Sequence, residues 1–301
     1  MTKKNFRGIV ENNPYIKKVW TIEKDVSEIV DNLKAEDFDY VVDLHKNLRT
    51  WRTRLALSTS SLVFHKLNVD KWLMVNLKIN RLPKVHIVDR YLQTVEKLGV
   101  QNDGAGLDYF IPTKDEVDIS TLGLPNVTKN GTPSDIFGTP QYIAFVIGAA
   151  HATKRLPTEK IIEICNKIHL PILILGGKED RENGELIESQ SIARVVNLCG
   201  KLNLNQSASV VRQATKVVTH DTGLMHIAAA FQKDIISVWG NTIPEFGMTP
   251  YILSEKSTIF EVNNLKCRPC SKIGFDKCPK GHFRCMNEQN TEGVAAAVNG
   301  E

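Results

Sequence analysis

The sequence predicts an α/β protein whose sheets are parallel and covered by helices on both faces. Short apolar runs alternate with helical patterns along most of the chain. In the second half these runs are apolar throughout instead of alternating, which is typical of parallel strands buried on both faces. The 301 residues are enough for two domains of ordinary size.

The first half contains the less regular part of this pattern. The helix expected at 26–33 rests on Ile29, Val30 and Leu33, which stand at helical spacing, and the last helix is expected to stop at Gly99. Strands are expected at 18–22, 38–44 and 62–67, and helices at 26–33, 49–56 and 91–98.

Residues 111–140 read as a linker between two domains. This stretch has few apolar runs and is rich in residues that break helices and strands, namely Pro112, Pro125, Gly131, Pro133, Gly138 and Pro140. We therefore predict an N-terminal domain at 1–137 and a C-terminal domain at 138–301.

The second half alternates regularly between strand and helix. Strands are expected at 142–147, 172–175, 195–198, 217–219 and 235–239, and helices at 158–168, 182–189, 206–214 and 223–230. This order predicts a doubly wound domain, whose ligands bind at the carboxyl ends of the strands.

Charge is concentrated in one stretch of the first half. The chain carries a net +4, yet residues 44–90 hold ten basic residues and only two acidic ones, Asp70 and Asp89. Such a segment indicates either an anionic partner or a solvated basic face, and its aromatic residues leave nucleic acid open on composition alone. The sequence shows neither an apolar run of membrane-spanning length nor a signal peptide, so we expect a cytoplasmic protein.

Three loops that follow predicted strands carry polar residues suited to a nucleotide. The first, 148–155, combines small residues with Lys154 and Arg155, which favours a phosphate. The second, 176–180, has paired glycines before Glu179 and Asp180, which are candidates for ribose hydroxyls or for a helix cap. For either loop, a purely structural role remains open.

The third loop opens a helix and gives the most specific signal. Asp221 stands at the turn, and Thr222 and Gly223 begin the helix, whose free N–H groups favour an anion. His226 lies one helical turn after Thr222 on the same face. A capping aspartate and a buried histidine are the alternative interpretation.

The run 221–230, Asp-Thr-Gly-Leu-Met-His-Ile-Ala-Ala-Ala, resembles the signature of the family 9 glycosyltransferases, the bacterial ADP-heptose:lipopolysaccharide heptosyltransferases and their relatives. Similar segments follow the family pattern elsewhere in the chain. They are the phosphate loop at 148–157, the glycine turn at 173–180, Gly-Lys-Leu-Asn-Leu at 200–204, and Asp-Leu-His-Lys-Asn-Leu-Arg at 43–49.

This resemblance implies a fold of the GT-B type, with two facing Rossmann-like domains, and inverting, metal-independent transfer of heptose from ADP-heptose to the lipid A–Kdo inner core. It implies that Lys154 holds the diphosphate, Glu179 faces the ribose and Leu202 the adenine. Asp221, Thr222, Gly223 and His226 would line the pyrophosphate and the sugar. No cofactor is required, and cationic side chains and helix-terminal amides stabilise the leaving ADP.

The expected partners are a nucleotide sugar and an anionic glycolipid at the inner membrane surface, to which the protein would attach peripherally, and no nucleic acid is expected. The basic stretch fits this acceptor, and we predict acceptor contacts from Lys46, Arg49 and Arg52. Two alternatives stay open. One is a GT-B enzyme that uses another sugar nucleotide, and the other is a non-catalytic nucleotide-binding remnant.

The chain departs from the family pattern in two places. It is expected to lack the first strand and the following loop, so that the N-terminal domain is incomplete. That loop carries the aspartate thought to act as general base, and no catalytic residue is assigned here. The second departure is at Ala149 and Ala150, where relatives carry hydroxyl residues, which weakens one set of phosphate contacts.

A cysteine-rich loop at 267–285 completes the sequence features. It contains four cysteines whose thiolates are suited to bind tetrahedral zinc, namely Cys267, Cys270, Cys278 and Cys285. A reduced loop that packs near the cleft is favoured over this structural zinc, and disulfides are the third alternative. Because the loop is basic, Arg268 and Lys272 are candidates for docking an anionic acceptor.

Overall fold

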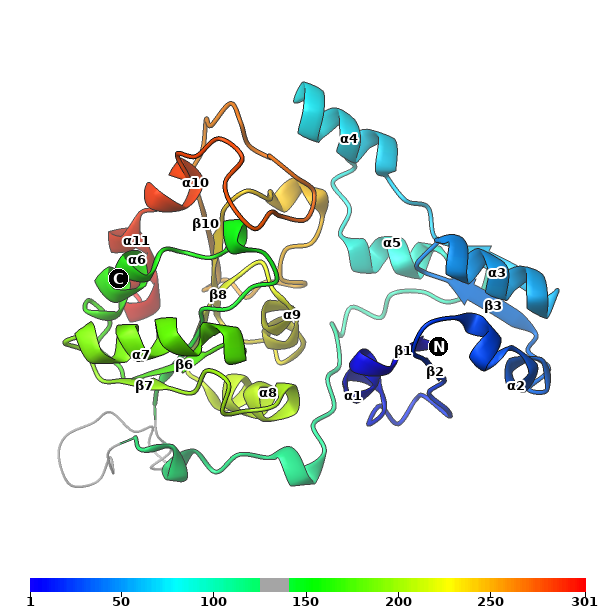
Figure 1. Cartoon of the computed structure of the whole chain (residues 1–301), viewed down its shortest axis with the longest axis horizontal. Helices are drawn as coiled ribbons and strands as arrows, with labels where there is room; N and C mark the ends of the chain where they lie inside the picture. Colours follow the sequence, from blue (N-terminus) through cyan, green and yellow to red (C-terminus); the bar gives the residue numbers. More distant parts are fainter. Residues whose placement is uncertain (125–140) are drawn as a thin grey trace.

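The computed structural model describes residues 1–124 and 141–301. The C-terminal half is built on one six-stranded sheet with the strand order β10-β9-β8-β5-β6-β7, and every strand pair in it is parallel (Figure 1). The strands are β5 (Ile143–Val146), β6 (Ile172–Leu175), β7 (Val195–Asn197), β8 (Lys216–His220), β9 (Ile235–Trp239) and β10 (Thr258–Glu261). The chain order reverses between β5 and β8, which is the topological switch point where doubly wound sheets bind ligands.

Alternate residues of each strand bury toward opposite faces of this sheet. Along β5, Ile143 and Phe145 enter one apolar cluster, whereas Ala144 and Val146 enter the other. Helices α6 (Thr158–Cys165), α7 (Arg181–Gln190) and α11 (Thr291–Asn299) supply the first cluster, and α8 (Leu204–Gln213) and α9 (Gly223–Ala230) supply the second. The continuously apolar strands therefore produce the predicted two-sided core.

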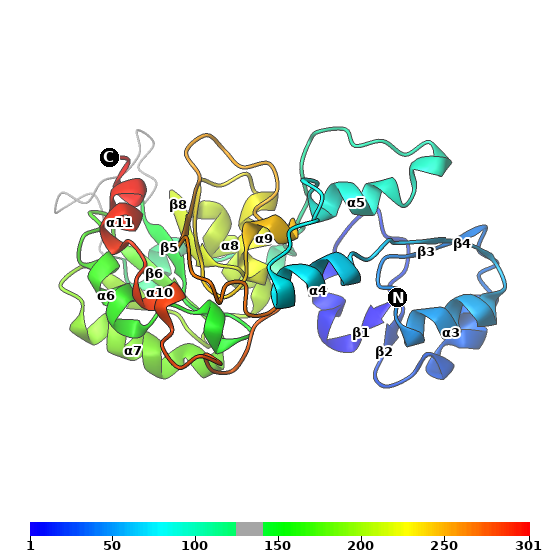
Figure 2. The same ribbon diagram turned by 90° about the horizontal axis from the view of Figure 1, so that it is seen from above.

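The N-terminal half is built on two separate two-stranded parallel sheets (Figures 1 and 2). Strand β1 (Thr2–Lys3) pairs with β2 (Thr21–Ile22), and β3 (Tyr40–Asp43) pairs with β4 (Ser60–Val63). The helices are α1 (Arg7–Val10), α2 (Val30–Lys34), α3 (Leu48–Leu57), α4 (Asn68–Leu77) and α5 (Ile87–Gln93). Its buried apolar cluster is small and consists of Ile22, Val26, Ile29 and Leu33.

Local capping shifts several elements from their predicted positions. Asp25 caps a 3₁₀ turn at Val26–Glu28, so α2 begins only at Val30. The helix predicted at 91–98 begins at Ile87, because the His86 ring accepts a hydrogen bond from the Val88 N–H. The strand predicted at 62–67 is β4, which ends at Val63. Helix α4, strand β10, α10 (Arg284–Asn287) and α11 were not predicted.

Polar contacts join the two halves at several points. The Ile87 N–H donates to the Gly247 carbonyl at 2.7 Å, and His86 Nε2 donates to the Thr249 carbonyl at 2.8 Å. Lys78 Nζ donates to the Pro269 carbonyl at 2.6 Å. These contacts place α4 and α5 beside the C-terminal half.

The predicted linker packs on α8 where the structure describes it. Asp115 accepts hydrogen bonds from Asn203 and Asn205, and Val117 N–H donates to Ser209. The predicted boundary between residues 137 and 138 lies outside the described residues. Within the two described ranges, no helix is both long enough and apolar enough to span a bilayer.

Candidate functional site

Lys154 and Asp221 meet at the switch point of the large sheet. Lys154 ends the 3₁₀ turn Ala152–Lys154 in the loop after β5, and Asp221 directly follows β8. The Lys154 Nζ atom lies 2.6 Å from Asp221 Oδ2, and the two side chains are only 13% and 6% exposed. The Thr242 hydroxyl donates to the same carboxylate oxygen at 2.9 Å. The arrangement holds one cation at the edge where a phosphate group would bind.

Helix α9 begins beside this ion pair. Thr222 is its N-cap and accepts a hydrogen bond from the Leu224 N–H at 3.2 Å. A Cβ atom built on Gly223 meets nothing within 4 Å, so neither packing nor the backbone requires glycine there. His226 is half-buried one turn further on, and burial lowers the pKa of its ring. The four residues predicted from the third loop thus gather around one helix N-terminus, which favours an anion.

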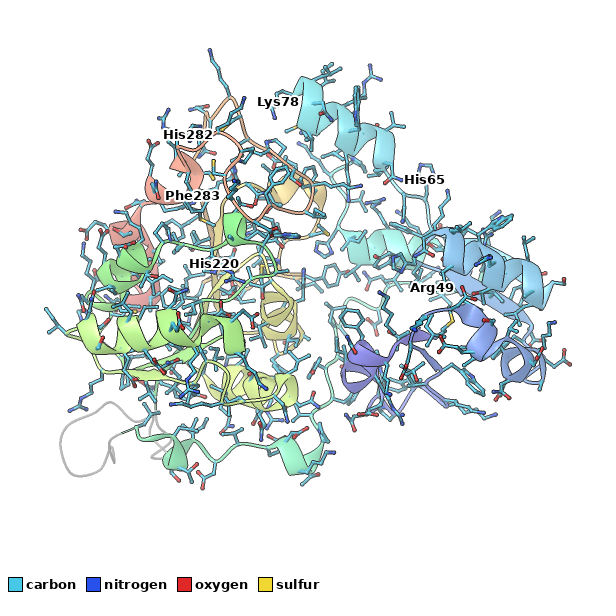
Figure 3. The ribbon with its side chains drawn as sticks, in the orientation of Figure 1. Arg49, His65, Lys78, His220, His282 and Phe283 are labelled. Carbon is cyan, nitrogen blue, oxygen red and sulfur yellow. The ribbon has the colours of Figure 1, made fainter. Side chains whose placement is uncertain are left out.

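The sequence reasoning missed the role of His220, which fixes the two loops to each other. Its ring is fully buried (Figure 3), and Nε2 accepts a hydrogen bond from the Leu156 N–H at 3.1 Å. Burial lowers the pKa of this imidazole to about 3, so the ring is neutral at pH 7. The only signal in the sequence was its position beside Asp221. His220 is therefore a positioning residue.

Asp180 also fixes loops and does not face a ligand. Its carboxylate accepts a hydrogen bond from the Gly177 N–H at 2.8 Å and lies 3.0 Å from Arg155 Nη1. Arg155 in turn donates to the Ala149 carbonyl. Asp180 is 2% exposed, and burial raises its pKa. Of the alternatives for the second loop, the structural role fits Asp180.

Replacing two glycines at this site gives a first prediction. Gly148 is needed for packing, whereas Gly223 stands in open space and is tested for a role in binding. A Cβ atom at Gly148 would lie 2.4 Å from Asp180 Oδ2, and the Gly177 and Arg155 contacts hold that carboxylate in place. We expect Gly148→Ala to lower the free energy of unfolding by about 1–3 kcal/mol. Gly223→Ala is expected to leave stability unchanged or to raise it by up to about 1 kcal/mol.

Urea unfolding of the two variants measures this difference, and a nucleotide titration of the stable variant measures its binding. Because Gly223 stands at the helix N-terminus in open space, its alanine variant should bind nucleotide more weakly despite its stability. Unchanged nucleotide affinity in Gly223→Ala would show that no ligand approaches this helix end closely.

Glu179 and Leu202, the other residues predicted to bind the donor, lie along the same edge of the sheet. Glu179 follows β6, is exposed, and folds its carboxylate over Gly177. Leu202 follows β7, is half-buried, and packs against the second apolar cluster. In the strand order β8-β5-β6-β7, Asp221, Lys154, Glu179 and Leu202 follow one another. Three strand spacings of ~4.8 Å give the row a length of ~14 Å.

The predicted acceptor residues lie apart in the N-terminal half. Arg49 lines a cavity of about 1120 Å³, which does not include Lys46 or Arg52 among its lining residues. Arg52 instead lies 3.3 Å from Asp25. Figure 3 shows Arg49 in the N-terminal half, across from His220 in the C-terminal half.

Asp43 is a carboxylate at a strand end of the N-terminal half. Its Oδ1 accepts hydrogen bonds from the backbone N–H groups of His45 and Lys46, and its Oδ2 lies 3.2 Å from Arg54 Nε. Asp43 is 3% exposed. These contacts commit Asp43 to its own loop, so we do not assign it as a general base.

The cysteine-rich loop packs on the phosphate loop. The Phe275 N–H donates to the Thr153 hydroxyl at 2.8 Å, and Thr153 N–H donates to the Phe275 carbonyl at 3.1 Å. All six cysteines are free thiols. Burial raises the pKa of Cys270 to about 11 and that of Cys285 to about 12. Among the described residues, no group of three or more side chains has metal-binding geometry.

The expectation that Arg268 docks an acceptor is wrong. Its guanidinium donates to the Gly240 carbonyl at 2.6 Å and to the Thr242 carbonyl at 2.8 Å, and it lies 2.6 Å from Glu261. The side chain is only 7% exposed, because it anchors the cysteine-rich loop to the strand ends. Lys272, by contrast, is exposed.

A sequence model of glycosyltransferase family 9 (heptosyltransferase) matches residues 26–278. The chain is 35% identical over 170 residues to lipooligosaccharide heptosyltransferase 2 of Haemophilus influenzae, a match that covers 51% of this chain and 48% of that protein. The chain thus matches about half the length of this curated relative.

Two solved structures share the fold. The family 9 glycosyltransferase of Veillonella parvula is 21% identical, with a TM-score of 0.66 over 86% of this chain and 76% of that one. The ADP-heptose lps heptosyltransferase II of E. coli is 16% identical, with a TM-score of 0.62 over 95% of this chain and 87% of that one. At these identities the likeness establishes the fold, and it confirms the predicted α/β class of the GT-B type.

Proposed function

Since the chain belongs to glycosyltransferase family 9, we propose that it transfers heptose from ADP-heptose to the inner core of lipopolysaccharide. The acceptor would be an anionic lipid A–Kdo glycolipid at the inner membrane surface, reached from the cytoplasm by a peripherally attached protein. The transfer would be inverting and would require no metal.

One observation carries this proposal, namely the cation held at the N-terminus of α9. Lys154 lies 2.6 Å from Asp221, which stands directly before the Thr222 cap of the helix. The positive end of a helix and an adjacent lysine together stabilise the negative charge of a diphosphate. A diphosphate bound there is also a leaving group whose developing charge meets donors already in position.

The row of donor residues supports a nucleotide diphosphate sugar over a smaller anion. The ~14 Å from Asp221 to Leu202 spans a diphosphate, a ribose and a base laid along the sheet edge. Lys154 would hold the diphosphate, Glu179 would accept bonds from ribose hydroxyls, and half-buried Leu202 would contact the adenine.

In the proposed reaction, an acceptor hydroxyl oxygen attacks the anomeric carbon of the heptose. The new glycosidic bond forms on the face opposite the breaking carbon–oxygen bond, so the configuration inverts. The electron pair of the broken bond leaves with ADP, whose charge Lys154 and the α9 amides would stabilise. We assign no residue of the chain to accept the hydroxyl proton.

Thermal unfolding with ADP, UDP and GDP tests the donor, and this is the second prediction. We expect ADP at 100 times its Kd to stabilise the fold by about 2.7 kcal/mol, and UDP and GDP to stabilise it less. Lys160→Met is a control for the loss of a lysine outside the proposed site, because this lysine lies on α6 and pairs with Glu163 at the surface. The control should respond to ADP as the unaltered chain does.

Each other result changes the proposal in a defined way. Equal or stronger stabilisation by UDP or GDP would indicate that the donor is another sugar nucleotide. No response of the folded protein to any of the three nucleotides would contradict a donor site at Lys154. A response to ADP without turnover of ADP-heptose would indicate the non-catalytic alternative.

A further inference from the structure

The basic residues that line the large cavity include Lys71 and three cations whose charges act on it, and the four come from both halves of the molecule. Lys66 follows β4, Lys71 lies on α4, and Arg90 lies on α5. Lys272 comes from the cysteine-rich loop of the C-terminal half. The sequence brings them from positions up to about two hundred residues apart, and the contacts of Lys78 and His86 with the C-terminal half hold their elements together.

Among the residues that the structure describes, these cations have no partner of opposite charge at close range. Within the ranges 1–124 and 141–301, none of the four makes an ion pair within 4 Å, although the charge of Asp70 acts on Arg90 from further away. The two carboxylates that line the cavity are already engaged, Glu36 with Lys18 at 2.7 Å and Asp43 with Arg54 at 3.2 Å.

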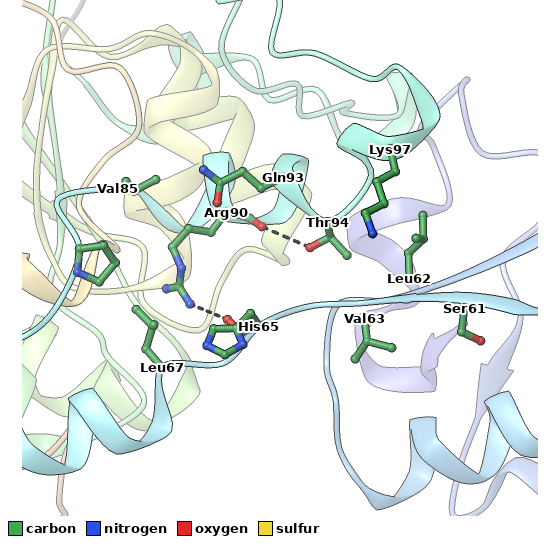
Figure 4. Close-up of a pocket in the computed structure, with 11 residues that line it drawn as sticks. Ser61, Leu62, Val63, His65, Leu67, Val85, Arg90, Gln93, Thr94 and Lys97 are labelled. Atoms are coloured by element: carbon green, nitrogen blue, oxygen red, sulfur yellow. Dashed lines mark hydrogen bonds between the residues drawn. The ribbon is translucent and has the colours of Figure 1, made fainter.

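Packing holds the two cations nearest the core in place. Arg90 is 8% exposed and donates to the His65 carbonyl at 2.8 Å (Figure 4). Its guanidinium also stands 5.0 Å from the Phe64 ring. It also borders a second cavity of about 520 Å³, which His65 and Lys97 line. Lys71 Nζ lies 5.8 Å from the Phe246 ring. These contacts hold Arg90 and Lys71 at the cavity wall.

The closeness of these like charges is unfavourable by itself. Burial, together with the charges of Arg90, Lys272 and Lys66, lowers the pKa of Lys71. Like charges that repel one another at a partly desolvated site destabilise the compact state. A bound anion would remove this cost, because each of the four groups can donate a charge-assisted hydrogen bond to it.

We propose that Lys66, Lys71, Arg90 and Lys272 form a subsite for phosphate groups of the acceptor. The subsite rests on the glycosyltransferase function proposed above, and it is separate from the Lys154 donor site and from Lys46 and Arg52, which lie outside the cavity lining. Lys272 gives the cysteine-rich loop a role, since it completes from the C-terminal half a site built mostly by the N-terminal half.

The third prediction separates binding from folding. Lys71→Met and Lys272→Met keep the aliphatic stems and remove one charge each. If the cations serve a ligand, each variant should raise the Tm of the empty protein by ~2 °C, because repulsion falls. Lys280→Met, in the same loop but outside the cavity lining, is the matched control and should leave the Tm unchanged.

The binding measurement uses D-glucose 1,6-bisphosphate with ADP held at saturation, so that the donor site is filled. We expect the bisphosphate to raise the Tm further at low salt, with an affinity that falls about tenfold or more in Lys71→Met and Lys272→Met but not in Lys280→Met. Cosedimentation with phosphatidylglycerol vesicles is the parallel measurement for phosphate carried by a lipid headgroup.

The outcomes distinguish the sources and the two proposals. A response to the bisphosphate that is weakened in both cavity variants assigns the subsite to a sugar phosphate. Vesicle binding alone that is lost in both cavity variants assigns it to a lipid headgroup. If neither probe distinguishes the cavity variants from Lys280→Met while ADP still stabilises the fold, the subsite is wrong and the donor site stands. Absence of an ADP response overturns the donor site instead.

Discussion

Lys154→Met is expected to lower the rate of ADP-heptose turnover by about 10²–10³-fold and the free energy of unfolding by ~3–5 kcal/mol. The rate falls because, in the proposed reaction, this lysine is the cation that would stabilise the leaving diphosphate. The stability falls because Asp221, only 6% exposed, loses the partner that lies 2.6 Å away and keeps the Thr242 hydroxyl. A buried carboxylate that has lost its cation lowers the free energy of unfolding by more than the intact ion pair contributes to it.

The double variant Lys154→Met/Asp221→Asn separates the two effects. Removing both charges is expected to restore most of the lost stability, since a neutral pair of similar volume replaces a buried ion pair at little cost. Turnover should stay low, because the cation is still absent. Urea unfolding and initial rates of ADP release measure the two quantities on the same preparations.

The result that would contradict this assignment is recovery of turnover together with stability in the double variant. Lys154 would then serve only to neutralise Asp221, and the diphosphate would have to bind elsewhere. Lys160→Met controls for loss of surface charge, because its partner Glu163 is exposed to solvent.

The local structure around Asp221 was predictable because its sequence signals are local. The strand, turn and helix around Asp221, Thr222 and Gly223 lie within one short stretch. The secondary structure of such a stretch is determined by the spacing of its apolar residues and by the residues that cap its helix. The alternation of apolar runs likewise predicted β5 to β9 close to their observed positions. The fold of the C-terminal half follows from these short-range patterns.

The N-terminal half and the proposed acceptor subsite were harder to predict because their contacts are long-range. The basic stretch was visible as composition, but Lys71 and Arg90 meet Lys272 only after the two halves associate. Arg268 had the same sequence signal as Lys272, yet its guanidinium is used to anchor the loop. No local pattern distinguishes a cation that faces a cavity from one that binds carbonyl groups nearby.

Acid should destabilise the protein steeply through His220. The ring is fully buried and accepts the Leu156 N–H, and its pKa in the folded chain is about 3. In the unfolded chain a histidine titrates near 6.5, so below that pH the unfolded state binds one more proton than the folded state. Stability is therefore complete above pH 6.5 and is lost as the pH falls toward 3, by about 1.4 kcal/mol per pH unit.

Urea unfolding of the unaltered chain and of His220→Gln at pH 7 and pH 5 measures this contribution of His220 to the pH dependence of stability. The glutamine carbonyl can accept the Leu156 N–H but does not titrate, so carboxylates contribute equally to both proteins. The stability of the unaltered chain relative to the variant should fall by ~2 kcal/mol between the two pH values. His169→Gln is the control for the loss of a histidine at an exposed position.

Protonation of His220 should also lower the affinity of the proposed donor site for ADP. His220 joins the end of β8 to the loop that carries Lys154, so its protonation would remove the acceptor of the Leu156 N–H and release that loop. Affinity for ADP should then fall with acid in parallel with stability, and His220→Gln should retain more of its pH 7 affinity at pH 5. If the two proteins lost affinity alike, the other contacts of the loop, such as the Arg155–Asp180 ion pair, would suffice to hold it, and His220 would have no part in positioning Lys154.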